Sequence, residues 1–192
     1  MDMLREERDW QFTLREIARR AGVSHGAPYK HFADKAALLA ELAMIGFDRL
    51  RDSMVQAGMA AGTAPQQQVL PVAQAYVQFG TDNPALYRLM FSAEGKTTAE
   101  VHLSEKAMGV FDLVIDLLGR GQADGTFRVR EVRGQAAACW SMIHGLTMLA
   151  IDGLLLPEKV GSAPLESALG TLLEGLGAKS GSPQPSPSGN GQ

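Results

Sequence analysis

The chain has 192 residues, 45% of them hydrophobic, and a mean hydropathy of −0.05, which is ordinary for a globular protein and excludes wholesale disorder. A net charge of −3 argues against a general nucleic-acid coat protein. The single cysteine, Cys139, excludes an intramolecular disulfide and suits a reducing compartment. The first ten residues hold no apolar run of the kind found in signal peptides, so we expect a cytoplasmic protein.

The segment from Thr13 to Phe32 predicts two helices joined by a tight turn. Thr13 and Glu16 have the spacing of a capping box at the start of a helix. Apolar residues then recur at helical spacing on one face: Leu14, Ile17, Ala18 and Ala21. Gly22 stands where a left-handed glycine ends a helix, and Ser24 can cap a second one that runs to about Phe32. This arrangement is a helix-turn-helix.

The second predicted helix carries groups that suit a DNA groove. Gly26 and Ala27 keep its N-terminal end slim. Its side chains offer hydrogen-bond donors to phosphates and base edges, from His25, Tyr29, Lys30 and His31. Between Thr13 and Lys35 there are five Lys/Arg against two Asp/Glu, although the whole chain is acidic. A plain amphipathic helix pair with a solvated basic face is the alternative interpretation.

These residues resemble the N-terminal domain of TetR-type bacterial transcription regulators, in which a capped helix, A-G-V-S and Y-x-H-F recur. The matching residues are Thr13, Ile17, Ala18, Ala21, Gly22, Val23, Ser24, Tyr29, His31 and Phe32, followed by Asp34, Lys35, Leu38 and Leu39. The resemblance implies that double-stranded DNA is the partner of the second helix. The DNA-binding residues that it implies are Thr13, Ser24, His25, Gly26, Ala27, Tyr29, Lys30, His31 and Lys35.

Two features depart from the family pattern. A full helix normally precedes the threonine cap, whereas Met1 to Phe12 can form only about two turns. Either the natural chain starts upstream of Met1, or the domain is held by fewer contacts, or Trp10 and Phe12 fill the gap. Pro28 would occupy the fourth position of the second helix, where it removes the first intrahelical hydrogen bond. Some branches of the family carry the same A-P-Y, so we treat Pro28 as tolerated.

The remainder of the chain predicts more helices and no strand, so the expected fold class is all-α. The expected helices span 34–59, 66–80, 82–91, 98–123, 131–156 and 164–176, with a break at 61–65, a loop at 94–98 and a turn at 124–127. We expect a DNA-binding domain at 1–46, a helical ligand-binding and dimerisation domain at 47–178, and a disordered tail at 179–192.

The segment from Glu131 to Leu156 is the most apolar part of the chain. It is long enough to cross a membrane, but Ser141, His144 and Thr147 interrupt it and no positively charged flank follows closely, so we expect no membrane span. A helix that is apolar nearly all round needs cover on both sides. This helix and the one at 164–176, taken from each of two chains, would make the four-helix interface of a homodimer.

Trp140, His144 and Gly145 resemble the W-x-x-x-H-G element in the C-terminal domain of one branch of TetR-type regulators. The resemblance implies a homodimer and a cavity for a small-molecule effector that the sequence does not identify. Candidate residues for the wall of that cavity are Phe79, Met90, Phe111, Trp140 and His144. Helical spacing equally makes these side chains plain core.

No pattern predicts catalysis, a metal or a cofactor. Cys139 and His144 are five residues apart, which separates them by about 140° around a helix, so they form no nucleophile–base pair. His102 has no second histidine at ligand spacing, and neither a Gly-rich phosphate loop nor a G-x-S-x-G elbow occurs. We therefore do not expect an enzyme.

The sequence favours a DNA-binding transcription regulator, specifically a ligand-responsive repressor that binds a pseudo-palindromic operator as a homodimer. The alternative is a dimerising small-molecule-binding protein whose DNA-binding domain is impaired by its short N-terminus. The sequence gives neither the operator nor the effector.

Overall fold

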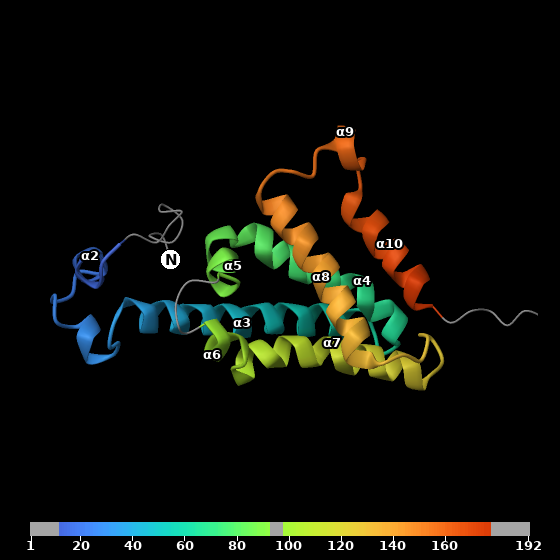
Figure 1. Ribbon diagram of the computed structural model, residues 1–192, viewed down its shortest axis with the longest axis horizontal. Coiled ribbons are helices and arrows are strands. Elements are labelled where there is room, and N and C mark those ends of the chain that lie inside the picture. The colour runs from blue at the N-terminus through green and yellow to red at the C-terminus, as the bar shows by residue number, and fades with distance from the viewer. Residues whose placement is uncertain (1–11, 93–97, 178–192) are drawn as a thin grey trace, which may run out of the picture.

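A computed structural model describes residues 12–92 and 98–177, and Figure 1 shows their arrangement. Regular structure in these two ranges is helical, apart from an isolated β-bridge between Phe127 and Gly177, which confirms the all-α prediction for them. The helices are α2 (Leu14–Arg20), the 3₁₀ helix η1 (Pro28–Lys30), α3 (Lys35–Ala60), α4 (Pro65–Asp82), α5 (Pro84–Met90), α6 (Thr98–His102), α7 (Glu105–Ala123), α8 (Val132–Ile151), α9 (Pro157–Val160) and α10 (Pro164–Leu176).

The longest helix, α3, joins the two ends of the molecule. It begins after Asp34, whose side chain accepts a hydrogen bond from the Ala37 N–H at 2.8 Å, and at 26 residues it is about 39 Å long. Figure 1 shows α3 running from η1 at one end into the bundle formed by the later helices. It continues without a break through the predicted domain boundary between residues 46 and 47, so the two predicted domains share this helix.

The core lies between α3, α4, α5, α7 and α8: α3 packs against α4, α5 and α7, and α8 packs against α4 and α7. On α3 the buried positions Phe47, Leu50 and Met54 recur at helical spacing and turn one face to that core. Tyr87 of α5 is completely buried. In the described residues, no helix combines the length and the apolar run that crossing a bilayer requires.

Two predicted helices of the C-terminal half differ from the expected bounds, one by an interruption and one by an earlier end. The helix expected at 98–123 is divided into α6 and α7, because the Ser104 hydroxyl accepts a hydrogen bond from the Ala107 N–H at 3.3 Å and starts a new helix. The helix expected at 131–156 ends at Ile151, because Gly153 adopts a φ of +68° and the chain turns away. The predictions for residues 1–11 and for the tail at 179–192 lie outside the described residues, as does most of the loop expected at 94–98.

The contact between Gly121 and Phe127 provides a test of this packing. Gly121 lies on α7 directly against the buried ring of Phe127, and a methyl group at Gly121 would overlap the ring. We expect Gly121→Ala to lower the free energy of unfolding by about 1–3 kcal/mol, measured as an earlier midpoint in urea. Gly119→Ala on the same helix is the matched control, because no atom lies within 4 Å of its added carbon. Alanine has a higher helix propensity than glycine, so Gly119→Ala should leave the free energy of unfolding unchanged or raise it by up to about 1 kcal/mol. Equal midpoints for the two variants would contradict the packing.

Candidate functional site

The first predicted helix of the N-terminal segment forms as α2, with both of its ends built as expected. The Thr13 hydroxyl accepts a hydrogen bond from the Glu16 N–H at 3.2 Å, and the Glu16 carboxylate accepts one from the Thr13 N–H at 2.6 Å. These hydrogen bonds favour the charged form and lower the pKa of Glu16. At the other end, Gly22 has a φ of +68° and the Val23 N–H bonds to the Ala18 carbonyl at 3.0 Å, which closes the helix and turns the chain.

The second predicted helix, expected from Ser24 to Phe32, is wrong in extent. Its regular part is only η1, and the position before η1 is Ala27, not Ser24. Pro28 has no N–H, so it cannot make the helical hydrogen bond to the Ser24 carbonyl. The Ala27 N–H bonds to that carbonyl instead, at 2.9 Å, and so closes a turn of three residues in place of four. The Phe32 N–H then bonds to the Pro28 carbonyl at 2.9 Å. The segment is therefore a turn followed by a short 3₁₀ helix.

The residues predicted to bind DNA lie in one largely exposed stretch of chain. Those with exposed side chains or backbone are Thr13, Ser24, His25, Gly26, Tyr29, Lys30 and His31, and Ala27 is half-buried. The Thr13 hydroxyl is already occupied by the capping box. Lys35 is also half-buried, and its ammonium lies 5.2 Å from the centre of the Phe12 ring. Phe12 is buried in the core, as the sequence allowed.

This end of the molecule presents positive charge to solvent. Arg15, Arg19 and Lys30 are exposed on α2 and η1. The two carboxylates of the same segment, Glu16 and Asp34, face backbone N–H groups at the starts of α2 and α3. Because the acidic groups are turned toward the backbone while the basic ones extend outward, the surface suits the phosphates of a nucleic acid.

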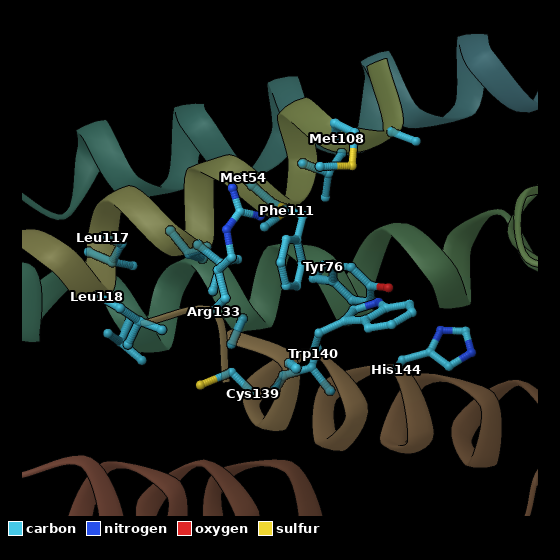
Figure 2. Close-up of a pocket in the computed structure, with 18 of the residues that line it drawn as sticks. Met54, Tyr76, Met108, Phe111, Leu117, Leu118, Arg133, Cys139, Trp140 and His144 are labelled. Atoms are coloured by element: carbon cyan, nitrogen blue, oxygen red, sulfur yellow. The ribbon is translucent and has the colours of Figure 1, made fainter. Parts of the chain in front are cut away.

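A partly enclosed cavity of about 560 Å³ lies in the larger helical part, between α3, α4, α7, α8 and α10 (Figure 2). This volume falls in the range of pockets that hold small organic ligands. Three of the five candidate wall residues line it, namely Phe111, Trp140 and His144. Phe79 and Met90 are buried but do not line it, so their placement in the wall is corrected. The Met90 side chain packs against Gly46 of α3.

Several lining residues were missed by the sequence reading, among them Tyr76, Phe91, His102 and Arg133. One pattern was available to find Arg133. Arg133, Ala137, Trp140 and His144 follow one another at intervals of four, three and four residues, which places them on one face of α8. Trp140 and His144 are candidate wall residues, so extending their face toward the start of α8 would have reached Arg133.

One end of the cavity is closed by a hydrogen-bonded aromatic group. The Tyr87 hydroxyl lies 3.0 Å from the Tyr76 hydroxyl and 2.7 Å from Nδ1 of His144. The Tyr87 ring stacks on the imidazole with centroids 5.5 Å apart, and Phe91 meets the imidazole edge-on at 4.5 Å. These contacts fix the orientation of His144 at the cavity wall.

Burial keeps these polar groups uncharged. It raises the pKa of Tyr76 to about 12 and raises the pKa of Tyr87 as well. Burial also lowers the pKa of His144, with a further lowering from the nearby charge of His102, and it lowers the pKa of His102 itself. Both histidines are therefore neutral at pH 7 and can serve as hydrogen-bond partners.

The residues that line the cavity suit ligand binding more than catalysis. Burial raises the pKa of the Cys139 thiol to about 11, so it is not a thiolate nucleophile at neutral pH. Across residues 12–92 and 98–177, no three His, Cys, Asp or Glu side chains come together as a metal site would need. What remains is an apolar space with a few fixed hydrogen-bonding groups, which is the usual form of a small-molecule site.

Comparison with known proteins places both parts of the chain. Residues 3–42 match the family model described as bacterial regulatory proteins, tetR family, and residues 69–172 match the one described as tetracyclin repressor-like, C-terminal domain. The chain is 26% identical over 164 residues to the uncharacterized HTH-type transcriptional regulator YobS of Bacillus subtilis (strain 168). The aligned residues cover 85% of this chain and 81% of YobS.

Solved structures agree with this placement. A protein of unknown function from Rhodococcus sp. RHA1 is 30% identical, with a TM-score of 0.72, over 86% of this chain and 85% of that one. A TetR family transcription regulator from Marinobacter aquaeolei VT8 shares the fold, with a TM-score of 0.66 and 18% identity over 92% of each chain. Because the match to the C-terminal family model alone spans more than half of the sequence, this protein belongs to the TetR family of bacterial transcription regulators.

Proposed function

We propose that this protein is a repressor that binds a pseudo-palindromic operator as a homodimer and releases it when a small molecule occupies the cavity. The observation that carries the proposal is the course of α3. Its first turn follows the exposed basic segment, and its buried residues Phe47 and Met54 line the cavity. The single helix α3 therefore connects the proposed DNA-binding segment with the proposed ligand cavity.

The exposed segment at 24–31 is the proposed DNA contact. Lys30 is assigned to base edges, together with the slim backbone at Gly26 and Ala27, and Tyr29 and His31 are assigned to phosphates. In a twofold dimer these segments would enter successive major grooves ~34–36 Å apart, so the operator would be an inverted repeat. The exposed arginines of α2 add attraction to the phosphate backbone without sequence preference.

The proposed dimer interface is the outer face of α8 together with α10. Figure 1 shows these two helices on the same side of the molecule, away from α2 and η1. Large apolar side chains on and just after α8 are exposed, with Leu149 at 40%, Leu154 at 48% and Leu156 at 52%. Clustered exposed apolar surface favours association, and two copies of these helices would form a four-helix interface.

Ligand response would follow from the position of the cavity against α3. A molecule that fits better when α3 is shifted would move the DNA-binding segments away from the spacing of successive grooves. This coupling requires unequal affinity of the ligand for the two arrangements, and its size is typically about 1–3 kcal/mol. The element formed by Trp140, His144 and Gly145 supports the same assignment, since two of its side chains line the cavity.

Replacing Lys30 tests the DNA contact. We expect Lys30→Ala to weaken binding to a sequence selected from random DNA by about tenfold or more, because a contact to a base edge contributes about 1–3 kcal/mol. Fluorescence anisotropy with labelled duplex gives the affinity. Lys159→Ala is the matched control, because it removes the same charge from an exposed site on α9, far from η1. Unchanged affinity in Lys30→Ala would rule out this role for Lys30, whereas a parent protein that enriches no sequence from random DNA would favour a dimeric small-molecule-binding protein with an impaired DNA-binding domain.

Replacing Leu149 tests the dimer. A glutamate at this exposed position would place charge in the proposed apolar interface, so we expect Leu149→Glu to shift the protein from dimer to monomer in size-exclusion chromatography with light scattering. Met59→Glu is the control, because Met59 is 76% exposed on α3, a helix that is not part of the proposed interface. A Leu149→Glu protein that stays dimeric at micromolar concentration would rule out this face.

A further inference from the structure

Arg133 brings one positive charge to the cavity. It lies in the first turn of α8, where its backbone N–H bonds to the Glu131 carboxylate at 2.9 Å, and its side chain lines the cavity. Figure 2 shows this side chain extending from α8 toward α7, beside Phe111. Arg133 is exposed, so its guanidinium is accessible to water.

Among the described residues, no carboxylate forms an ion pair with this guanidinium. The ion pairs found there join other residues: Arg88 with Asp152, Lys106 with Asp48, and Arg120 with Asp116. The described lining of the cavity contains no aspartate or glutamate, and its two histidines are neutral at pH 7. Arg133 is thus the single formal charge among the described lining residues. A cationic ligand would be repelled there, and a neutral one would leave the charge without a partner.

The charged group and the hydrogen-bonding groups stand at different places along α8. Arg133 and His144 are eleven residues apart on the same face of the helix, which corresponds to ~16 Å along its axis. The face between them carries Ala137 and Trp140, and Phe111 lies opposite on α7. A ligand that reaches both ends therefore needs an extended apolar body with an anionic group at one end only.

We propose that the effector is an amphipathic monocarboxylate, whose carboxylate pairs with Arg133 and whose apolar body lies along α8 toward Trp140 and His144. This assignment rests on the proposed function, because it names the ligand class of the effector cavity. A guanidinium matches a carboxylate with two parallel hydrogen bonds. A phosphate monoester carries close to a second negative charge, which no described lining residue would balance.

Tryptophan fluorescence can test this on the full chain. The sequence contains two tryptophans, Trp10 and Trp140, so Trp10→Phe leaves the cavity residue as the sole indole. Decanoate, decanol, decylamine and decyl phosphate share one alkyl chain and differ in the head group. Titrated below their aggregation limits, they should bind in the order decanoate, decanol, decylamine, with about a fivefold preference for the acid over the alcohol, as a solvent-exposed ion pair allows.

Variants in the same background assign that preference to one side chain. Arg133→Gln should lower decanoate affinity about fivefold and leave decanol affinity within a factor of about two. Arg133→Lys, which keeps the charge, should retain part of the preference and shows that the site tolerates substitution. Arg130→Gln is the matched control, because Arg130 is exposed in the same segment and does not line the cavity, so it should behave as the parent.

Three results would overturn the assignment: equal affinity for decanoate and decanol, tighter binding of decyl phosphate than of decanoate, or an equal loss in Arg130→Gln and Arg133→Gln. Release of selected operator DNA is measured separately. Arg133-dependent decanoate binding without DNA release supports the ligand class and counts against the proposed ligand response. DNA release at the same half-maximal concentration of decanol as of decanoate supports the response and, like equal binding affinity, overturns the carboxylate assignment.

Discussion

The unbroken hydrogen bonding of α3 is the constraint on which the rest of the structure depends. Asp34 starts this helix beside the basic segment, and its backbone then continues through the core without a proline or a left-handed residue. Its buried stripe packs against α4, α5 and α7. In the proposed regulator, a displacement at Met54 would be carried along this continuous helix toward the basic segment.

The sequence predicted best those features that depend on neighbouring residues. The Thr13 capping box, the Gly22 helix end and the Asp34 cap are each decided within a few positions, and each forms as expected. The errors also have local causes. Pro28 was recognised as a lost hydrogen bond, but its effect was underestimated, since the chain tightens into a 3₁₀ turn and does not continue as an α-helix.

The cavity was predictable only in part, because its lining depends on how each helix is rotated about its own axis. Phe79 and Met90 have the apolar character expected of a wall residue, yet they face the core, while Tyr76 of α4 faces the cavity. That rotation is set by contacts such as Met90 against Gly46, between residues far apart in sequence. On α8 the resemblance to a W-x-x-x-H-G element singles out Trp140 and His144, which both line the cavity, whereas periodicity alone does not separate wall residues from core residues.

The two polar ends of the cavity differ in what a ligand can gain from them. Tyr76, Tyr87 and His144 already hydrogen-bond to one another through the two hydroxyls and Nδ1, and among the described residues no buried side-chain polar atom lacks a hydrogen-bond partner. This end therefore mainly sets shape, because a ligand gains little by replacing hydrogen bonds that exist without it. Arg133 exchanges only water for a ligand anion, so preference between ligands arises there.

The positions of the two polar ends also affect how ligand binding would be coupled to DNA release in the proposed regulator. Both polar ends belong to α8 or contact it, and α8 is the helix assigned to the dimer interface, whereas α3 meets the cavity only through the apolar side chains of Phe47 and Met54. In the proposed regulator, Arg133 would fix the head group of the ligand to α8, the helix of the dimer interface. The apolar body of the ligand would act on α3 only by packing against its side chains. Head-group chemistry would then set affinity, and the size of the apolar body would set how far the DNA-binding segments move, because close-packed side chains do not compress to admit added volume.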